Sequence, residues 1–293
     1  MLIGKNPLNE APDWFVKNIG NRPEECSVSV NGAEIKYFVW GDRSKKPLLL
    51  LHGYNAHSYW WDHIAPALTE SHCVVALDFS GMGESARREE YSQEIFVEDV
   101  KGVIDDLAWS ACTCIAHSMG GSIATLATST YPDFFEHLIL LDSMIVIPPN
   151  VAERMASNRP SARMVVASPD LETAMARFRL TPPQPCKDYV LRHIAETSYV
   201  EKSDGWHLKS DPLIPNTYKY NDLHDSFTKI NCELDYVYGQ ASQLVTKEVL
   251  EYMTYVGNMD EKNIHCLSGA MHHLFLDMPC LLYTSPSPRD SSK

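Results

Sequence analysis

The stretch CIAHSMGGSIATL, residues 114–126, decides the fold class of this chain. It begins as an apolar strand, turns at Ser118, and continues as a run of small residues with helical character. Ala116 and Gly120, two residues before and after the serine, are small enough for a strained turn to pack against its neighbours. This is the strand–turn–helix context of a nucleophile elbow, with Ala116 where that motif usually has its first glycine. The alternative is an ordinary joint in which Ser118 caps the helix.

Short β-rich runs lie on both sides of this stretch and give the order of the expected sheet. The first two are joined by Asn31-Gly32, which predicts a hairpin. From Leu48 onward the runs are nearly all apolar and alternate with helical stretches, as in a parallel sheet covered on both faces. We therefore predict an α/β fold with a mostly parallel eight-stranded sheet, its strands at 26–30, 34–40, 47–51, 73–77, 112–116, 137–141, 233–238 and 263–267.

The alternation breaks after the sixth strand. Residues 143–231 contain amphipathic helical pieces at 171–180 and 187–200, separated by Pro-rich joints, and no convincing strand of the main sheet. A helical insertion at the end of such a sheet predicts a lid that shapes the ligand cavity. The predicted core then comprises residues 1–142 and 232–279. Several lid residues either line an apolar cavity with an anion-binding edge or hold the lid to the sheet: Arg177, Phe178, Arg179, Tyr199 and Trp206.

The last fourteen residues, CLLYTSPSPRDSSK (280–293), keep neither helical nor strand spacing. Over Cys280 to Asp290 they resemble the translation of a sequencing-library adapter. We interpret them as a non-native tail, and we expect that the natural sequence is interrupted near Pro279 and that a terminal helix is missing.

Composition excludes several classes of function. The 293 residues carry a net charge of −13, which repels a nucleic-acid backbone, and no apolar run is long enough to span a bilayer. The N-terminal residues lack the unbroken apolar stretch of a secretory signal, so we predict a cytoplasmic protein. Cys112 and Cys114 form a C-x-C pair, but no second Cys or His pair completes a metal site, and we interpret both as core residues.

Two Gly-containing stretches follow strands of the predicted sheet. In LLLLHGYNAHSYWW (48–61), Gly53 allows the backbone to turn so that the Tyr54 N–H faces Ser118. Together with the Met119 N–H, this amide could hold a developing oxyanion. The stretch ALDFSGMGESA (76–86) lacks the third Gly of a dinucleotide site and the Lys-Ser/Thr of a phosphate loop, so we interpret it as structural.

A histidine pair lies near the end of the patterned region, in CLSGAMHHLFLDMP (266–279). A base that takes the serine proton and later returns it belongs on a loop beside the elbow, with an affinity for protons suited to neutral pH. In isolation, His272 and His273 would be surface or packing residues. The order strand, Ser118, helical insertion, strand, His favours a general base instead.

With these segments in place, the chain from about Glu25 to Pro279 resembles α/β-hydrolases of the serine-hydrolase-like kind. The resemblance implies the α/β-hydrolase fold, a serine nucleophile at Ser118, and a base at the His seven residues before Pro279, which is His272. A serine at the elbow argues against dehalogenase or epoxide-hydrolase chemistry, which in this fold relies on a carboxylate nucleophile.

The third member of a triad is less clear in this sequence. Many relatives place an Asp three residues after Gly239, where this chain has Ser242. A hydroxyl cannot supply the negative charge that stabilises an imidazolium. Asp142, at the carboxyl end of the sixth strand, is the candidate acid; otherwise it caps the turn that follows. Asp235 is a poor alternative because it lies near the start of a strand.

We therefore hypothesise an esterase in which Ser118 attacks a carbonyl, His272 acts as base, Asp142 orients it, and the Tyr54 and Met119 amides hold the oxyanion. No metal or organic cofactor is expected, and the partner is a small molecule with an acyl group. Two alternatives stay open: a carbon–carbon bond hydrolase using the same Ser and His, and a non-catalytic binding protein on this scaffold. The sequence gives no indication of substrate identity or oligomeric state.

Overall fold

The sheet begins with the hairpin that the Asn31-Gly32 turn predicts. Strand β1 (Glu24–Val30) pairs antiparallel with β2 (Ala33–Trp40), and Asn31 and Gly32 have positive φ angles of 49° and 81°. Both residue types tolerate this backbone region, so the turn matches the twist of the strands it joins.

The computed structural model describes residues 7–157 and 166–279.

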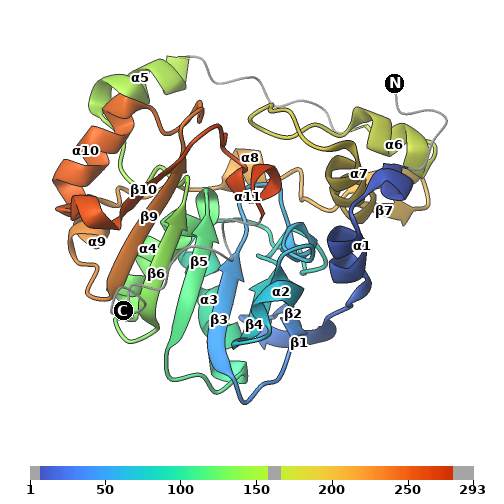
Figure 1. Ribbon diagram of the computed structural model, residues 1–293, viewed down its shortest axis with the longest axis horizontal. Coiled ribbons are helices and arrows are strands. Elements are labelled where there is room, and N and C mark those ends of the chain that lie inside the picture. Colours follow the sequence, from blue (N-terminus) through green and yellow to red (C-terminus); the bar gives the residue numbers. More distant parts are fainter. Residues whose placement is uncertain (1–6, 158–165, 280–293) are drawn as a thin grey trace.

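Eight strands of the described chain form one sheet in the order β1-β2-β4-β3-β5-β6-β9-β10 (Figure 1). The pairs β1–β2 and β2–β4 are antiparallel, and every pair from β4 to β10 is parallel. This confirms the predicted mostly parallel, eight-stranded sheet. The remaining bounds are β3 (Lys46–Leu51), β4 (His72–Leu77), β5 (Cys112–His117), β6 (Phe135–Leu141), β9 (Glu233–Gly239) and β10 (Ile264–Leu267).

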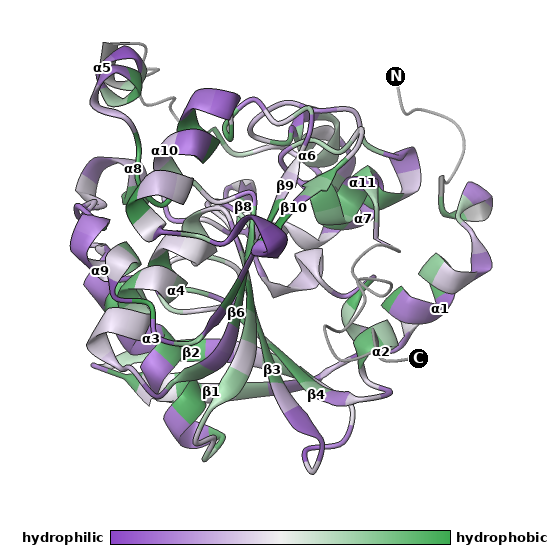
Figure 2. Cartoon of the chain, turned by 60° about the vertical axis from the view of Figure 1, so that its left-hand side comes forward, coloured by the Kyte–Doolittle hydropathy of each residue, from purple (hydrophilic) through white to green (hydrophobic). Residues whose placement is uncertain are grey.

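Helices cover both faces of the sheet because neighbouring residues of a strand point to opposite faces. Leu49 belongs to one apolar cluster and Leu50 to the other, and both side chains are buried. Figure 2 shows the central strands as largely hydrophobic. The cluster on one face includes residues of α3 (Gln93–Asp106), α4 (Met119–Thr130), α9 (His224–Thr228) and α10 (Lys247–Gly257). The other cluster includes residues of α1 (Asp13–Gly20), α2 (Ala65–Leu68), α7 (Asp188–Thr197) and α11 (Leu274–Asp277).

The segment between β6 and β9, here called the inserted segment, follows the sixth strand as expected. Besides α7 and α9 it contains α5 (Pro149–Ser157), α6 (Leu171–Arg177), α8 (Ile214–Thr217), and the two strands β7 (Tyr199–Lys202) and β8 (Gly205–Leu208). The prediction of one helix over 187–200 was wrong at its end. The helix stops at Thr197, and Val200 pairs with His207 in a two-stranded hairpin separate from the main sheet.

Two buried polar contacts tie α7 to the loop that follows β3. His193 Nε2 lies 2.8 Å from Asp62 Oδ1, and His57 Nε2 lies 2.9 Å from Ser198 Oγ. Because these groups have lost contact with water, each needs its partner. The inserted segment is therefore held to the part of the core that carries Gly53 and Tyr54.

No helix in the described ranges is long and apolar enough to cross a membrane. Residues 280–293, for which we predict a non-native origin, lie outside the described residues.

Candidate active site

The turn at Ser118 joins β5 to α4 and holds the serine in a strained conformation. Its φ and ψ are 53° and −119°, a region that non-glycine residues rarely adopt. The Ser118 N–H donates to the Leu141 carbonyl at 3.1 Å. A Cβ on Gly120 would lie 2.7 Å from the His52 carbonyl oxygen, so only glycine allows α4 to start this close to the end of β3. The small residues around Ser118 thus serve the close packing that the sequence indicated.

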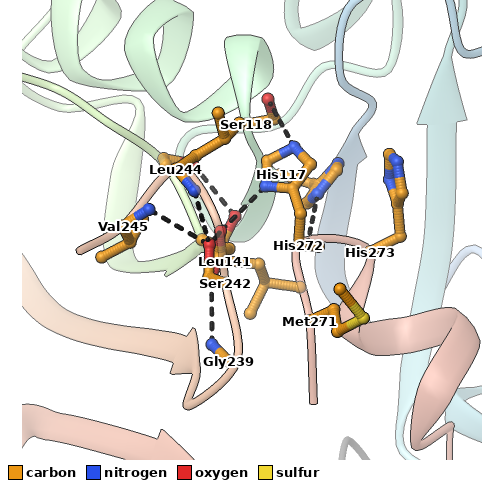
Figure 3. A network of polar contacts seen from close by, with 12 residues as sticks. His117, Ser118, Leu141, Gly239, Ser242, Leu244, Val245, Met271, His272 and His273 are labelled. Atoms are coloured by element: carbon orange, nitrogen blue, oxygen red, sulfur yellow. Dashed lines mark hydrogen bonds and ion pairs between the residues drawn. The ribbon is translucent and has the colours of Figure 1, made fainter. Parts of the chain in front are cut away.

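His272 approaches Ser118 from the loop between β10 and α11. Its Nε2 lies 3.1 Å from the Ser118 Oγ, and its side chain is buried (Figure 3). This loop packs closely against the end of β9. The Ala241 N–H donates to the Ala270 carbonyl, and Gly239 lies so near the same oxygen that a Cβ on it would be only 2.5 Å away. The structure thus brings together two residues 154 positions apart in the sequence.

Asp142 completes a hydrogen-bonded chain with these two residues. It follows β6 directly, is fully buried, and its Oδ1 lies 2.8 Å from His272 Nδ1. The Gly239 N–H donates to Asp142 Oδ2 at 2.9 Å, and the Ser242 hydroxyl donates to Oδ1 at 2.7 Å. A carboxylate at this place accepts the Nδ1 proton, which leaves the Nε2 lone pair of His272 directed at Ser118.

The other candidate acid lies elsewhere. Asp235 in β9 accepts from His137 Nε2 at 2.7 Å and from His265 Nε2 at 2.8 Å, on the strands to either side. These contacts lower the pKa of Asp235, with the hydrogen bond from His137 as the largest cause. None of the hydrogen bonds of Asp235 in the described chain involves His272.

The loop after β3 lies against the elbow, as a role in oxyanion binding requires. A Cβ on Gly53 would lie 3.1 Å from the Ser118 Cβ and 2.9 Å from His117 Nδ1. Tyr54 follows this glycine, and Met119 is the first residue of α4. The role of their two backbone amides stays a prediction.

Two further histidines lie beside His272. His117 Nε2 donates to the His272 carbonyl at 3.1 Å, and the rings of His117 and His273 lie 4.7 and 4.8 Å from the His272 ring. Burial lowers the pKa of His117 well below its usual value and that of His273 to about 3, and the other imidazoles add to both effects. Both rings are therefore neutral at pH 7. No role was predicted for His117 from the sequence, although its place directly before Ser118 was an available signal.

Within residues 7–157 and 166–279, the candidate metal ligands are the same three histidines, His117, His272 and His273. They can offer ligand atoms that lie within 4.8 Å of one another. However, His272 Nε2 faces Ser118, and His117 Nε2 faces a backbone carbonyl. The arrangement thus fits proton transfer at Ser118 without a metal, and our expectation of a metal-free site stays a prediction.

A cavity of about 220 Å³ lies in the inserted segment between α6 and α7. Phe178 and Arg179 line it, as one of the two sequence interpretations proposed. Phe178 also packs against Trp60, with ring centroids 6.4 Å apart, and Trp60 packs against His273 at 5.4 Å. The other basic and aromatic candidates are placed differently: Arg177 donates to Ser168 Oγ, Tyr199 packs on Phe178, and Trp206 lies in the hairpin.

A family model described as the alpha/beta hydrolase fold matches residues 46–256 of the chain. The protein belongs to this family. Curated relatives include a serine hydrolase-like protein of Danio rerio, 33% identical over 138 residues, which are 46% of this chain and 42% of that protein. Epoxide hydrolase 4 of Mus musculus is 36% identical over 122 residues, which are 40% of this chain and 34% of that protein. The match thus spans less than half the length of each of these relatives, and it confirms the resemblance seen in the sequence.

Solved α/β structures share the architecture. A thioesterase domain from the curacin biosynthetic pathway has a TM-score of 0.74 and 24% identity, covering 89% of this chain and 98% of that one. E-2-(acetamidomethylene)succinate hydrolase has a TM-score of 0.74 and 18% identity, covering 89% and 96%. At these identities the similarity establishes the fold.

Proposed function

We propose that this protein is a serine hydrolase that cleaves a carboxylic ester or a related acyl bond through an acyl-enzyme at Ser118. The observation that carries the proposal is the continuous chain from Ser118 Oγ to His272 to Asp142, with distances of 3.1 and 2.8 Å. The strained backbone at Ser118 and the burial of His272 and Asp142 support it.

The reaction proceeds in two halves. Ser118 Oγ attacks the acyl carbon while His272 Nε2 takes its proton, and the Tyr54 and Met119 N–H groups hold the oxygen that becomes negative. His272 then gives the proton to the leaving alkoxide, which departs as an alcohol. A water molecule loses a proton to His272 and attacks the acyl-enzyme, and the carboxylic acid leaves as Ser118 recovers its proton. Asp142 holds the imidazole and stabilises its positive charge throughout.

The domain assignment belongs to the same proposal. Residues 1–142 and 232–279 form the hydrolase core, and residues 143–231 form a lid over the site. The buried contacts of Asp62 with His193 and of His57 with Ser198 support a lid held beside the oxyanion loop. The proposed substrate is a small molecule with an acyl group, in a cytoplasmic setting, and the mechanism uses no metal or organic cofactor.

Similarity to a protein named epoxide hydrolase 4 favours epoxide ring opening as a second candidate function. In that chemistry a carboxylate attacks the ring, and the elbow of this chain presents the hydroxyl of Ser118 instead. Carbon–carbon bond hydrolysis uses the same Ser and His on a vinylogous diketone. A binding protein on this scaffold would keep the cavity but would not turn over any of these substrates.

The test is a comparison of three substrate classes with purified protein: p-nitrophenyl acetate, styrene oxide and a vinylogous diketone. We expect turnover of the ester, a burst of p-nitrophenol equal to the enzyme concentration, and loss of both in Ser118→Ala. Turnover of styrene oxide or the diketone in preference to the ester would overturn the ester assignment. Absence of all three activities in folded protein would favour the binding protein.

A further inference from the structure

Ser242 occupies the position at which many relatives carry an acid, and the structure gives it specific contacts. It lies on the loop after β9, three residues beyond Gly239, and its Oγ is 2.7 Å from Asp142 Oδ1. The same Oγ accepts the N–H groups of Leu244 at 3.2 Å and of Val245 at 3.1 Å. Figure 3 shows these contacts converging on one oxygen.

These contacts fix the direction of the hydroxyl proton. A serine oxygen has two lone pairs and one O–H, and the hydrogen normally rotates to suit its surroundings. Here the two backbone N–H groups use both lone pairs, so the O–H of Ser242 is left to donate to Asp142. Ser242 is therefore a donor of fixed orientation.

Asp142 depends on such donors because it is buried: the residue has no exposed surface. A buried carboxylate keeps its charge when hydrogen bonds replace the lost water. Three donors do so here: His272 Nδ1 and the Ser242 hydroxyl at Oδ1, and the Gly239 N–H at Oδ2.

We propose that Ser242 is a positioning residue for the catalytic acid: its hydroxyl holds Asp142 Oδ1 in the place from which it orients His272. The end of β9 thus contributes a neutral donor while the end of β6 contributes the charge. This inference rests on the proposed serine-hydrolase function, but it concerns the contact between Ser242 and Asp142 alone.

From the same contacts we expect that an acid can act on His272 from either position. Ser242 Oγ lies 2.7 Å from the oxygen that binds His272, and that oxygen lies 2.8 Å from His272 Nδ1. An aspartate at position 242 would carry its carboxylate one bond beyond the present Oγ, toward the place of Asp142 Oδ1, from which an acid faces the imidazole. An asparagine at position 142 can then donate to the carboxylate introduced at position 242, which reverses the present pair.

The first test compares Ser242→Ala and Ser242→Thr with wild type, with Thr246→Ala as matched control. Thr246 caps α10 through a hydrogen bond to the Val249 N–H, so its loss perturbs the same region without touching Asp142. For p-nitrophenyl acetate we expect kcat to fall about tenfold to a hundredfold in Ser242→Ala, the cost of one hydrogen bond to a charged group, with KM within twofold. Ser242→Thr retains the hydroxyl and most of kcat, and Thr246→Ala retains all of it. A kcat unchanged in Ser242→Ala, or lowered equally in Thr246→Ala, overturns the proposal.

The second test exchanges the two positions. We expect Asp142→Asn to be nearly inactive, and the double variant Asp142→Asn/Ser242→Asp to recover at least about tenfold over it, because a charge again faces His272. Ser242→Asp alone places two carboxylates in contact and lowers activity at neutral pH. A double variant no more active than Asp142→Asn overturns the interchangeability of the two positions.

A third readout does not require activity, so it separates this inference from the proposed function. The proton between His272 and Asp142 gives a low-field signal in the proton NMR spectrum, assigned by its loss in His272→Gln. We expect Ser242→Ala to shift or broaden this signal, and Ser242→Thr and Thr246→Ala to leave it in place. If the variants show this pattern but the wild-type protein hydrolyses no ester, the result contradicts the proposed function and supports the role of Ser242. A signal unaffected by Ser242→Ala contradicts that role.

Discussion

Replacing Asp142 by asparagine removes one charge from the proposed active site and leaves its shape nearly unchanged. Asn tolerates the positive φ of 46° at this position, so we expect the variant to fold. Its amide, however, has only one acceptor oxygen, whereas His272 Nδ1 and the Gly239 N–H each require one. If the NH₂ group faces His272, the imidazole changes tautomer and presents an N–H to Ser118, and it can no longer act as a base.

The size of the effect follows from the distance between the two charges that form during the reaction. At the 2.8 Å between Asp142 Oδ1 and His272 Nδ1, an effective dielectric constant of about 20 gives an attraction of about 6 kcal/mol. Loss of this stabilisation lowers kcat/KM by about 10⁴-fold. The assay is the initial rate with p-nitrophenyl acetate, with Asp235→Asn as a matched control that removes an aspartate of the same sheet. A decrease of less than tenfold in Asp142→Asn, or an equal decrease in the control, would refute the assignment of Asp142 as the acid.

Three further predictions concern the surroundings of the proposed triad. In Gly53→Ala the new Cβ lies 3.1 Å from the Ser118 Cβ, so the loop that carries Tyr54 is displaced and kcat should fall about 100-fold. The control Gly20→Ala, whose new Cβ meets nothing within 4 Å, should leave kcat unchanged. Asp62→Ala leaves His193 buried without its partner and should reduce the free energy of unfolding in urea by about 3 kcal/mol; a change below about 0.5 kcal/mol would contradict this. Burial lowers the pKa of His52 from 6.5 to about 4. Between these pH values the unfolded chain binds a proton that the folded chain does not, so the free energy of unfolding falls by about 3 kcal/mol as the pH decreases from 6.5 to 4. In His52→Gln the unfolding temperature should therefore fall less between pH 6.5 and 4 than in wild type, and an equal fall would contradict the linkage.

The sheet and the elbow could be predicted because their signals are local. A strand with both faces buried is apolar at every position, as Leu48 to Leu51 are, and its alternation with helices implies parallel pairing. Ser118 was proposed as the nucleophile from its strand–turn–helix context. A histidine base was expected in the loop after the last strand, and the resemblance to serine-hydrolase-like proteins selected His272 over His273. These features depend on few neighbours in sequence.

The hairpin β7–β8 was missed because helical spacing continues from α7 into its first strand. Tyr199 and Val200 extend the apolar pattern of the helix, so the pattern alone gave no boundary. A local signal existed in Gly205, which has a φ of 127° and pairs with Lys202 directly after the two-residue turn Ser203-Asp204.

The contacts around His272 could not be predicted from the sequence, because they join residues far apart along the chain. His117 and His272 are 155 positions apart, and Ser242 and Asp142 are 100 apart. The hydroxyl of Ser242 cannot supply a negative charge, and Asp142 was therefore predicted as the alternative acid. The hydrogen bond between the two side chains was not predicted, since that requires the ends of β6 and β9 to be placed in space.

The most direct test of the account is fluorophosphonate labelling of the purified protein, with the modified peptide located by mass spectrometry. This reagent forms a covalent bond with a serine that an adjacent base has activated. We predict a single label on Ser118, absent in Ser118→Ala and much slower in His272→Gln. A label on another serine, or no label on protein shown to be folded, would contradict the assignment of Ser118 as the nucleophile.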